Sequence, residues 1–432
     1  MTIWETTLSL SVVSQRVLAV VRGSGSPVAK AEIVRVADLS LATVTEHVDL
    51  LVACNLLREE EFGLSSGGRR PKLYGFNADA GRILAVDLES THVRVALTDF
   101  APRILTQIES DDIDVAQGPE TTLNTIHDLA RHVLQAAGAK PRDVKGLGIG
   151  LPGPVTFTAG LPSSLSIMPG WENYPVRSFW KSKFDCPSYV DNNVYTMALG
   201  ERTHEAHRTP TELIFVKIGN GIGAGIILDG TVYRGATEHA GEIGHTNIGH
   251  MELCYCGNRG CLEAFAGGRA IAARAEIEAR AGRSERLAAI LAEKKKLGLR
   301  DVIRALEESD PIAVALIRDS GNAIGRVLAG LVNYTNPSHI VVGGGVSQVG
   351  DVLLAAIRQS IYQNALPLLT RRLIIEHSAV GPNAGLLGAA LLALDHAIPE
   401  NFTTRTALEK VAVVEPRSLE VRRRKGAPRG QS

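Results

Sequence analysis

Residues 242–263 read EIGHTNIGHMELCYCGNRGCLE and contain three of the chain's five cysteines. Cys254, Cys256 and Cys261 lie close together in this segment, and His245 lies nine positions before the first of them. Thiolates and an imidazole are ligands that Zn²⁺ takes in closed tetrahedral sites, and the glycines between the cysteines let the backbone turn so that the sulfurs converge. The segment therefore predicts a structural zinc site, because four protein ligands leave no position open for catalysis.

Two alternatives to this interpretation stay open on the residues alone. His250 is closer in sequence to Cys254 and competes with His245 as the fourth ligand. Cysteines can also serve as small buried apolar side chains without any metal. The crowded pattern Cys-x-Cys-Gly-x-x-Gly-Cys favours zinc. In either case Glu242 and Glu263, which flank the segment, remain free to bind another group.

Length and composition indicate a soluble chain with more than one domain. A chain of 432 residues exceeds one ordinary core and predicts about three domains, or a small domain beside a bipartite one. The N-terminus lacks the features of a signal peptide. The apolar run at 384–394 is shorter than the roughly 18 residues that suggest a membrane span. Basic and acidic residues number 46 each, so net charge says nothing about nucleic acid.

The cysteines also bear on location. Three are clustered, while Cys54 and Cys186 are isolated, so they do not form a disulfide framework. We therefore expect a protein of the reducing cytoplasm with no membrane partner.

The first 54 residues predict three helices, over 15–21, 29–37 and 41–54. Glycines and Pro27 end the first helix, and Ser40 is placed to cap the third. Three helices with a tight turn between the second and third are typical of a helix-turn-helix. The positions expected to face the core of this domain are Ile33, Val36, Val44, Val48 and Leu51.

Two short strands are predicted at 56–59 and 72–76, around a glycine-rich loop at 63–71. A hairpin after a helix-turn-helix is a winged helix, and the cations of this loop suit phosphates or a minor groove. A solvated charged loop is the alternative, which the preceding helices disfavour. The candidate DNA-binding residues are Thr43, Thr45, His47, Arg69, Arg70 and Lys72.

The predicted recognition helix holds no lysine or arginine, and residues 1–80 carry eight basic against nine acidic side chains. We therefore expect a single copy to bind DNA weakly. Two copies on a twofold site add their contacts, so we expect a homodimer or a dimer of dimers on double-stranded operator DNA.

Beyond residue 80, apolar strands alternate with helical stretches. A hairpin is predicted at 83–99, and strands at 144–151, 213–218 and 339–342 each run into a glycine-rich turn. Strands that end in glycine turns and are separated by helices predict an α/β architecture with its ligand at the strand ends.

The chain from residue 15 to about 397 resembles the ROK family (repressors, unassigned frames and sugar kinases), in particular its members with an N-terminal winged helix. The resemblance rests on SGGRRP at 66–71, GLPGPV at 150–155, MPGW at 168–171, Glu-x-Gly-His at 242–245, the cysteine cluster, and GGGVS at 343–347.

The resemblance implies an α/β fold in three parts. A winged helix-turn-helix over 1–80 is followed by a two-lobed actin-like/ribonuclease-H-like domain over 81–397. That domain has a hinge near 195–205, and its C-terminal helix returns to the first lobe. A basic, flexible tail over 398–432 completes the chain.

The resemblance also implies a sugar or sugar derivative in the cleft between the lobes, with zinc bracing the loop that contacts it. It assigns His245 as the fourth zinc ligand, and Glu242, His245 and Glu263 as sugar contacts. Carboxylates accept hydrogen bonds from neighbouring hydroxyls, and a histidine with one ring nitrogen on zinc can offer the other to the sugar. The implied sugar-binding set is completed by Gly153, Asn192 and Asn193.

Three positions depart from the sugar kinases of this family. Asn193 stands where those kinases carry the aspartate base, and an amide cannot accept the proton of an attacking hydroxyl. Asp191 is two strand residues away, about 6 to 7 Å, which is too far to replace it. Glu89 replaces a glycine of the phosphate hairpin, and a carboxylate about 4 Å from a triphosphate costs on the order of several kcal/mol. Asn220 replaces a threonine between two glycines.

The sequence thus predicts a cytoplasmic transcriptional regulator, in the first instance a repressor, that binds operator DNA and senses a carbohydrate effector without enzymatic activity. An ATP-dependent sugar kinase with an accessory DNA-binding head is the alternative. A third interpretation is a scaffold whose inactive cleft binds another protein.

Overall fold

The computed structural model describes residues 10–60, 71–163, 168–208, 210–345 and 349–401 of the chain. The chain divides into two compact units, Met1–Ala80 with Ala397–Ser432, and Gly81–His396. The last helix continues to Asn401, so it includes the first residues of the expected tail; the rest of that tail lies outside the described residues.

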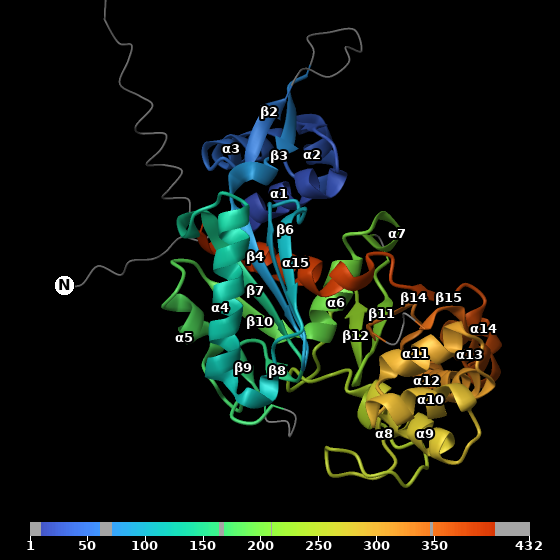
Figure 1. Cartoon of the computed structure of the whole chain (residues 1–432). Coiled ribbons are helices and arrows are strands. Elements are labelled where there is room, and N and C mark those ends of the chain that lie inside the picture. The colour runs from blue at the N-terminus through green and yellow to red at the C-terminus, as the bar shows by residue number, and fades with distance from the viewer. Residues whose placement is uncertain (1–9, 61–70, 164–167, 209, 346–348, 402–432) are drawn as a thin grey trace, which may run out of the picture. The chain divides into compact units, whose positions relative to one another are not determined.

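The first unit is a helix-turn-helix followed by a β-hairpin (Figure 1). Ser40 caps the third helix by accepting a hydrogen bond from the Thr43 amide at 3.1 Å, as predicted. The expected stripe Val44, Val48 and Leu51 is fully buried. The elements are α1 (Val12–Ser24), β1 (Val28–Ala29), α2 (Lys30–Ala37), α3 (Leu41–Ala53), β2 (Leu57–Glu60) and β3 (Leu73–Phe76), with strand order β1-β3-β2.

One core assignment in α2 is wrong. Ile33 is buried, but Val36 is 52% exposed and Ala37 takes the second core position. Residues four apart in a helix lie about 40° from one another around the axis, so Ile33 and Ala37 share one line toward the core. Val36 falls on the other side of Ile33 and faces solvent.

The second unit contains two five-stranded sheets of like design, as expected for the two-lobed fold. In each sheet three antiparallel strands are extended by two parallel ones. The first sheet has the order β10-β7-β4-β5-β6 and the second β13-β12-β11-β14-β15. The first is built from β4 (Arg82–Leu88), β5 (Val93–Thr98), β6 (Ile104–Ser110), β7 (Val144–Leu151) and β10 (Ser188–Asn192). The second is built from β11 (Leu213–Ile218), β12 (Ile222–Leu228), β13 (Thr231–Val232), β14 (His339–Gly343) and β15 (Ile374–His377).

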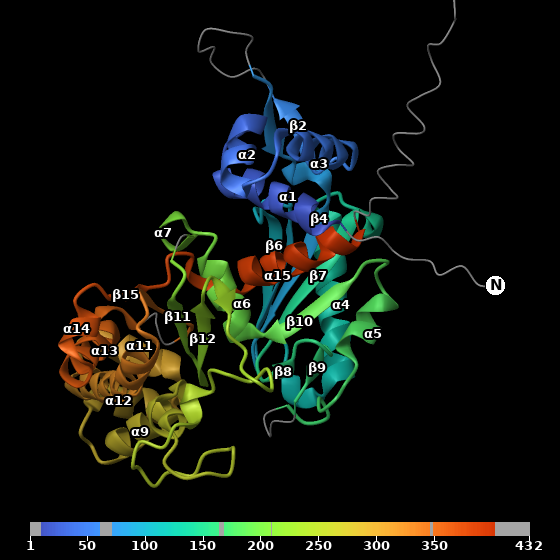
Figure 2. The same ribbon diagram turned by 180° about the vertical axis from the view of Figure 1, so that it is seen from behind.

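Helices cover these sheets. Figures 1 and 2 show α4 on one face of the first sheet and α15 on the opposite face. A small hairpin, β8 (Val155–Thr156) and β9 (Leu161–Pro162), follows β7. The helices of this unit are α4 (Pro119–Ala136), α5 (Val176–Lys181), α6 (Asn193–Glu201), α7 (Glu205–Arg208), α8 (Leu262–Ala266), α9 (Gly268–Arg280), α10 (Glu285–Lys294), α11 (Leu299–Glu307), α12 (Pro311–Thr335), α13 (Asp351–Asn364), α14 (Pro367–Thr370) and α15 (Ala384–Asn401).

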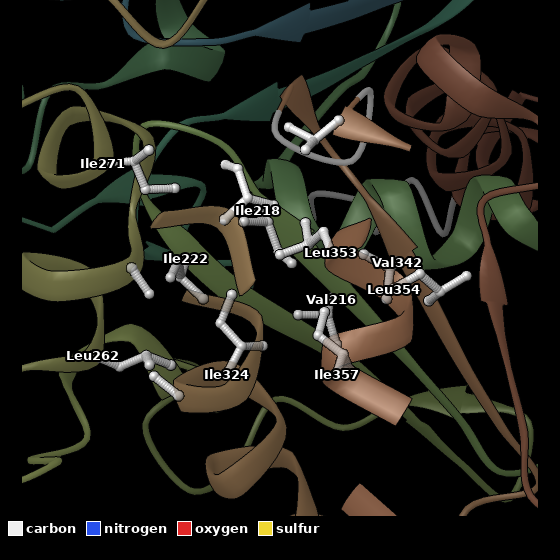
Figure 3. Close-up of a cluster of buried hydrophobic side chains, with 14 of the residues drawn as sticks. Val216, Ile218, Ile222, Leu262, Ile271, Ile324, Val342, Leu353, Leu354 and Ile357 are labelled. Carbon is white, nitrogen blue, oxygen red and sulfur yellow. The ribbon is translucent and has the colours of Figure 1, made fainter. Parts of the chain in front are cut away.

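Strand β11 is apolar on both sides because it has a core on each face. Val216 and Ile218 point into the cluster of Figure 3, where they meet side chains from α9, α12 and α13. Leu213 and Phe215, at the alternate positions, point into a second cluster with residues of α6. A strand covered on both faces reads as a continuous apolar run, which is the pattern that predicts it.

Glycines bring α6, α15 and β7 into backbone contact. A Cβ placed on Gly388 of α15 would lie 1.5 Å from the carbonyl oxygen of Thr196 in α6. A Cβ on Gly148 of β7 would lie 1.8 Å from the carbonyl oxygen of Ala389, and one on Gly200 of α6 would lie 1.8 Å from that of Ala384. Any side chain at these positions must therefore push two main chains apart.

We predict that Gly388→Ala destabilises the second unit by at least about 2 kcal/mol, because overpacking against backbone cannot be relieved by a side-chain rotation. Gly330→Ala, in α12, is the matched control, since a Cβ there has no neighbour within 4 Å among the described atoms. That control should be neutral or stabilising by up to about 1 kcal/mol. Thermal unfolding measures both, and equal midpoints would contradict the packing argument.

Candidate functional site

Four side chains of the 242–263 segment converge on one point. The ligand atoms of His245, Cys254, Cys256 and Cys261 all lie within 4.8 Å of one another. The sulfurs of Cys256 and Cys261 are 3.7 Å apart, and the Cys254 sulfur lies 3.6 Å from Nδ1 of His245. Ligands about 2.0 to 2.3 Å from a tetrahedral Zn²⁺ are separated by roughly 3.5 to 3.8 Å. The two measured separations match this range, and all four ligand atoms lie within 4.8 Å of one another.

The backbone explains how the segment reaches this geometry. Gly257 and Gly260 have φ angles of 91° and 77°, which side-chain-bearing residues rarely adopt. These turns let Cys261 come back beside the start of the segment, where it forms a β-bridge with Asn247. His250, the other candidate ligand, stacks on Phe265 at 4.1 Å between ring centroids and is not among the four converging residues.

The two flanking carboxylates lie beside this cluster. Glu263 follows Cys261 in the first turn of α8, is 8% exposed, and accepts a hydrogen bond from the amide of Ile222 at 2.8 Å. Glu242 immediately precedes the short 3-10 turn that carries His245. Burial, and then the charge of Glu263, raise the pKa of Glu242 to about 7, against the opposing effect of Lys217. The two acids are therefore close enough to repel each other when both are ionised.

Of the remaining predicted sugar contacts, Asn192 joins this group directly. Asn192 ends β10 and caps α6 through Val194, and its amide nitrogen lies 3.5 Å from Oε1 of Glu242. Asn193 begins α6 and is buried. Gly153 lies in the turn after β7 and, within the described chain, makes no hydrogen bond to the other five. The structure thus brings Asn192 and Glu242 into direct contact.

Both polar atoms of the Asn193 side-chain amide form hydrogen bonds. Its nitrogen donates to the carbonyl of Leu88 at 3.0 Å, and its oxygen accepts from Lys217 Nζ at 3.2 Å. The same Nζ donates to Glu89 Oε2 at 2.6 Å. Lys217 therefore links the two residues, Asn193 and Glu89, at which the sequence is expected to depart from the kinases.

This link changes the expectation for Glu89. The sequence treats its carboxylate as an uncompensated charge, whereas Lys217 neutralises it across 128 positions of sequence. Lys217 was missed, although a single cation in the apolar strand 213–218, two residues before a glycine loop, was a usable signal.

Two further buried acids lie near the base position. Asp191 is fully buried and accepts a hydrogen bond from Arg234 at 2.6 Å; burial raises its pKa to about 6 although Arg234 opposes the rise. Asp87, on β4, accepts no hydrogen bond from the described residues, and burial followed by Glu89 raises its pKa to about 7. Asp191 is thus held by Arg234.

A cavity of about 320 Å³ opens beside Glu263. Its wall combines polar groups of the glycine loop, α8 and α9 with the ring of Tyr255, which stands between two of the converging cysteines. The polar or aromatic residues that line it include Ser90, Asn220, Tyr255, Glu263 and Arg269.

The candidate DNA contacts lie on the first unit. Thr43 and Thr45 are half-buried on α3, and Thr43 bonds to the Ser40 hydroxyl. His47 shares a hydrogen bond of 2.9 Å with Ser14 of α1, so one of its ring nitrogens is used inside the unit. Lys72 is exposed and pairs with Glu59 at 2.8 Å. Arg69 and Arg70 lie outside the described residues.

Membrane insertion finds no support in the helices. Within the described ranges, no helix combines the length and the apolar character needed to cross a bilayer.

Comparison with known proteins connects both units to one family. The ROK family model matches residues 83–396. The xylose repressor of Caldicellulosiruptor bescii is 31% identical over 370 residues, which cover 85% of this chain and 92% of that protein. The glucokinase of Halalkalibacterium halodurans is 30% identical over 72% of this chain and 94% of its own length.

A solved structure described as a ROK family transcriptional regulator, a homologue of the E. coli Mlc protein, has a TM-score of 0.77 at 25% identity. It covers 92% of this chain and 98% of its own. Both regulators match a larger share of this chain than the glucokinase does. Their matches are also longer than the segment 83–396 that the family model matches. The chain therefore belongs to the ROK family and has the two-part organisation of its transcriptional regulators.

Proposed function

We propose that this protein is a cytoplasmic transcriptional repressor that binds operator DNA and releases or tightens its hold when a carbohydrate enters the ROK cleft. It acts as a homodimer or a dimer of dimers. The cleft binds the sugar without phosphorylating it. The observation that carries binding without phosphorylation is Lys217, whose ammonium group contacts both Asn193 and Glu89.

Sugar binding is supported by the donor and acceptor groups of the cleft. Glu242 and Glu263 supply carboxylate oxygens, and Asn192 lies next to Glu242. Such groups hydrogen-bond the adjacent hydroxyls of a sugar ring, with Asn193 and Gly153 completing the set. His245 contributes its Nε2, because Nδ1 faces the cysteines.

The absence of phosphoryl transfer follows from the groups around Asn193. An amide cannot take the proton of an attacking hydroxyl, and this amide is already bonded on both sides. The nearest alternative base on the strand, Asp191, is held by Arg234. Lys217 is bound to Glu89, so its charge is not free to stabilise a transferring phosphate.

The metal is proposed to be Zn²⁺, held by His245, Cys254, Cys256 and Cys261. Three thiolates and one imidazole with these separations suit zinc and leave no place for a substrate. When bound, the ion would fix the segment that carries His245 and leads into Glu263, and would supply no reaction chemistry.

A sugar kinase with a DNA-binding head is the second candidate. Asp87 remains in the phosphate hairpin, and the H. halodurans glucokinase is almost as similar in sequence as the C. bescii repressor is, though over a shorter stretch. Sugar-dependent ATP turnover that disappears in Glu242→Gln would favour this candidate over the proposed one.

We expect stoichiometric zinc in freshly purified protein by elemental mass spectrometry. Cys254→Ser should lower zinc occupancy and the melting temperature, because it removes one of four ligands. Cys186→Ser, a cysteine of the same unit outside the cluster, should retain full zinc. Substoichiometric zinc in the wild type would remove the metal from the proposal.

We expect the full-length protein to prefer one duplex sequence in a fluorescence titration at moderate salt. The double substitution of Arg69 and Arg70 by alanine should lower affinity and flatten the logarithmic salt dependence by about two, since each phosphate contact contributes a slope of about 0.9. The same change at the exposed pair Arg371 and Arg372 of the second unit is the control. Wild-type protein without sequence preference would contradict the regulator proposal.

We expect sugar affinity to rise as pH increases from 6 to 8. The pKa of Glu242 is about 7, so the carboxylate is largely protonated below this pH and ionised above it, and the ionised form accepts hydroxyl hydrogens better. Glu242→Gln should bind at least about tenfold more weakly at pH 8 and lose this part of the pH dependence. Calorimetry with D-xylose and D-glucose measures both, with the exposed Glu172→Gln as control. A flat wild-type profile would count against Glu242 as a sugar ligand.

A further inference from the structure

Tyr255 places a hydroxyl at the centre of the cleft residues. It stands between Cys254 and Cys256, and its phenol oxygen lies 3.3 Å from Nε2 of His245. The two rings meet edge to face, with centroids 5.4 Å apart and planes at 79°. The imidazole nitrogen assigned to the sugar is therefore already in contact with an internal hydroxyl.

The same hydroxyl faces both carboxylates. Tyr255 and Glu263 line the same cavity, and burial, followed by the charges of Glu263 and Glu242, raises the pKa of the phenol. A hydroxyl that contacts His245 and lies near both acids stands among all three proposed sugar contacts.

The donor and acceptor roles match those of a sugar hydroxyl. Nδ1 of His245 faces the Cys254 sulfur at 3.6 Å, so Nε2 carries the hydrogen when Nδ1 binds a metal and donates it to the phenol oxygen. The phenol keeps its own hydrogen to donate toward the nearby acids. A hydroxyl of a ligand accepts from the same imidazole, so it cannot do so while the phenol is in place.

Tyr255 can leave this position without moving the loop. Its side chain is 38% exposed and forms part of the wall of the 320 Å³ cavity. Its neighbours in sequence, Cys254 and Cys256, are two of the four converging residues, and they hold the backbone on both sides. A rotation about the side-chain bonds would move the phenol oxygen away from His245.

We infer that Tyr255 is an internal competitor for the effector, whose phenol occupies the place of a ligand hydroxyl until a polyhydroxylated ring displaces it. The inference rests on the proposed function, because it concerns the same cleft. It also sets a requirement on the ligand: one of its hydroxyls must take the place of the phenol oxygen beside Nε2 of His245.

Tyr255→Phe tests this inference, because it keeps the ring and removes the competing hydroxyl. Calorimetric titration of the zinc-loaded full-length protein with D-xylose and D-glucose should show affinity roughly three- to tenfold higher in the variant, the equivalent of one net hydrogen bond. Tyr334→Phe, at a residue 90% exposed on α12, should leave affinity unchanged. Zinc content is measured in all three proteins and should be equal.

Each result has a distinct meaning. Tighter binding by Tyr255→Phe alone supports the inference. Equal or weaker binding, with zinc intact, overturns it while leaving the proposed function standing, and weaker binding would make Tyr255 a sugar contact instead. If neither wild type nor variant binds either sugar, the sensing function itself fails for these ligands, and the inferred competition for them fails with it.

Discussion

The close approach of α6, α15 and β7 is the constraint on which the second unit depends. Main chain meets main chain at Gly148, Gly200 and Gly388, where no Cβ fits. Because the contact is between backbones, the positions of the helices do not depend on side-chain rotamers. Helix α6 begins with Asn193 directly after β10, so this packing fixes where the base position of the cleft lies relative to the first sheet.

The cleft contains several acidic side chains, and nearby cations neutralise some of them. Asp87, Asp191 and Glu242 all have raised pKa values, and burial is the largest cause in each case. Arg234 forms an ion pair with Asp191, and Lys217 forms one with Glu89. The charge of Lys217 also opposes the rise in the pKa of Glu242. Glu242 and Glu263, the acids of the proposed sugar site, lie next to the converging cysteines. This distribution suits recognition of neutral hydroxyls better than that of phosphates.

Local patterns predicted much of this molecule, and contacts between distant segments were the part they missed. Apolar runs ending in glycine located β7, β11 and β14, because strand period and turn chemistry are local properties. Cysteine spacing identified three converging side chains but could not choose between His245 and His250, since that choice depends on how Phe265 packs. The burial of Ala37 in place of Val36, and the pairing of Lys217 with Glu89, depend on partners that no sequence window contains.

Lys217 also changes how the departures from the kinases relate to one another. On the sequence, Asn193 and Glu89 are two separate losses, one at the base and one at the phosphate loop. In the structure a single ammonium group contacts both, so the three residues act as one unit. An aspartate at position 193 would lie beside that ammonium group, which favours the ionised form and lowers the basicity of the carboxylate. A glycine at position 89 would free Lys217 but leave the amide at 193 unable to accept a proton. A change at either position alone therefore leaves the obstacle at the other position in place.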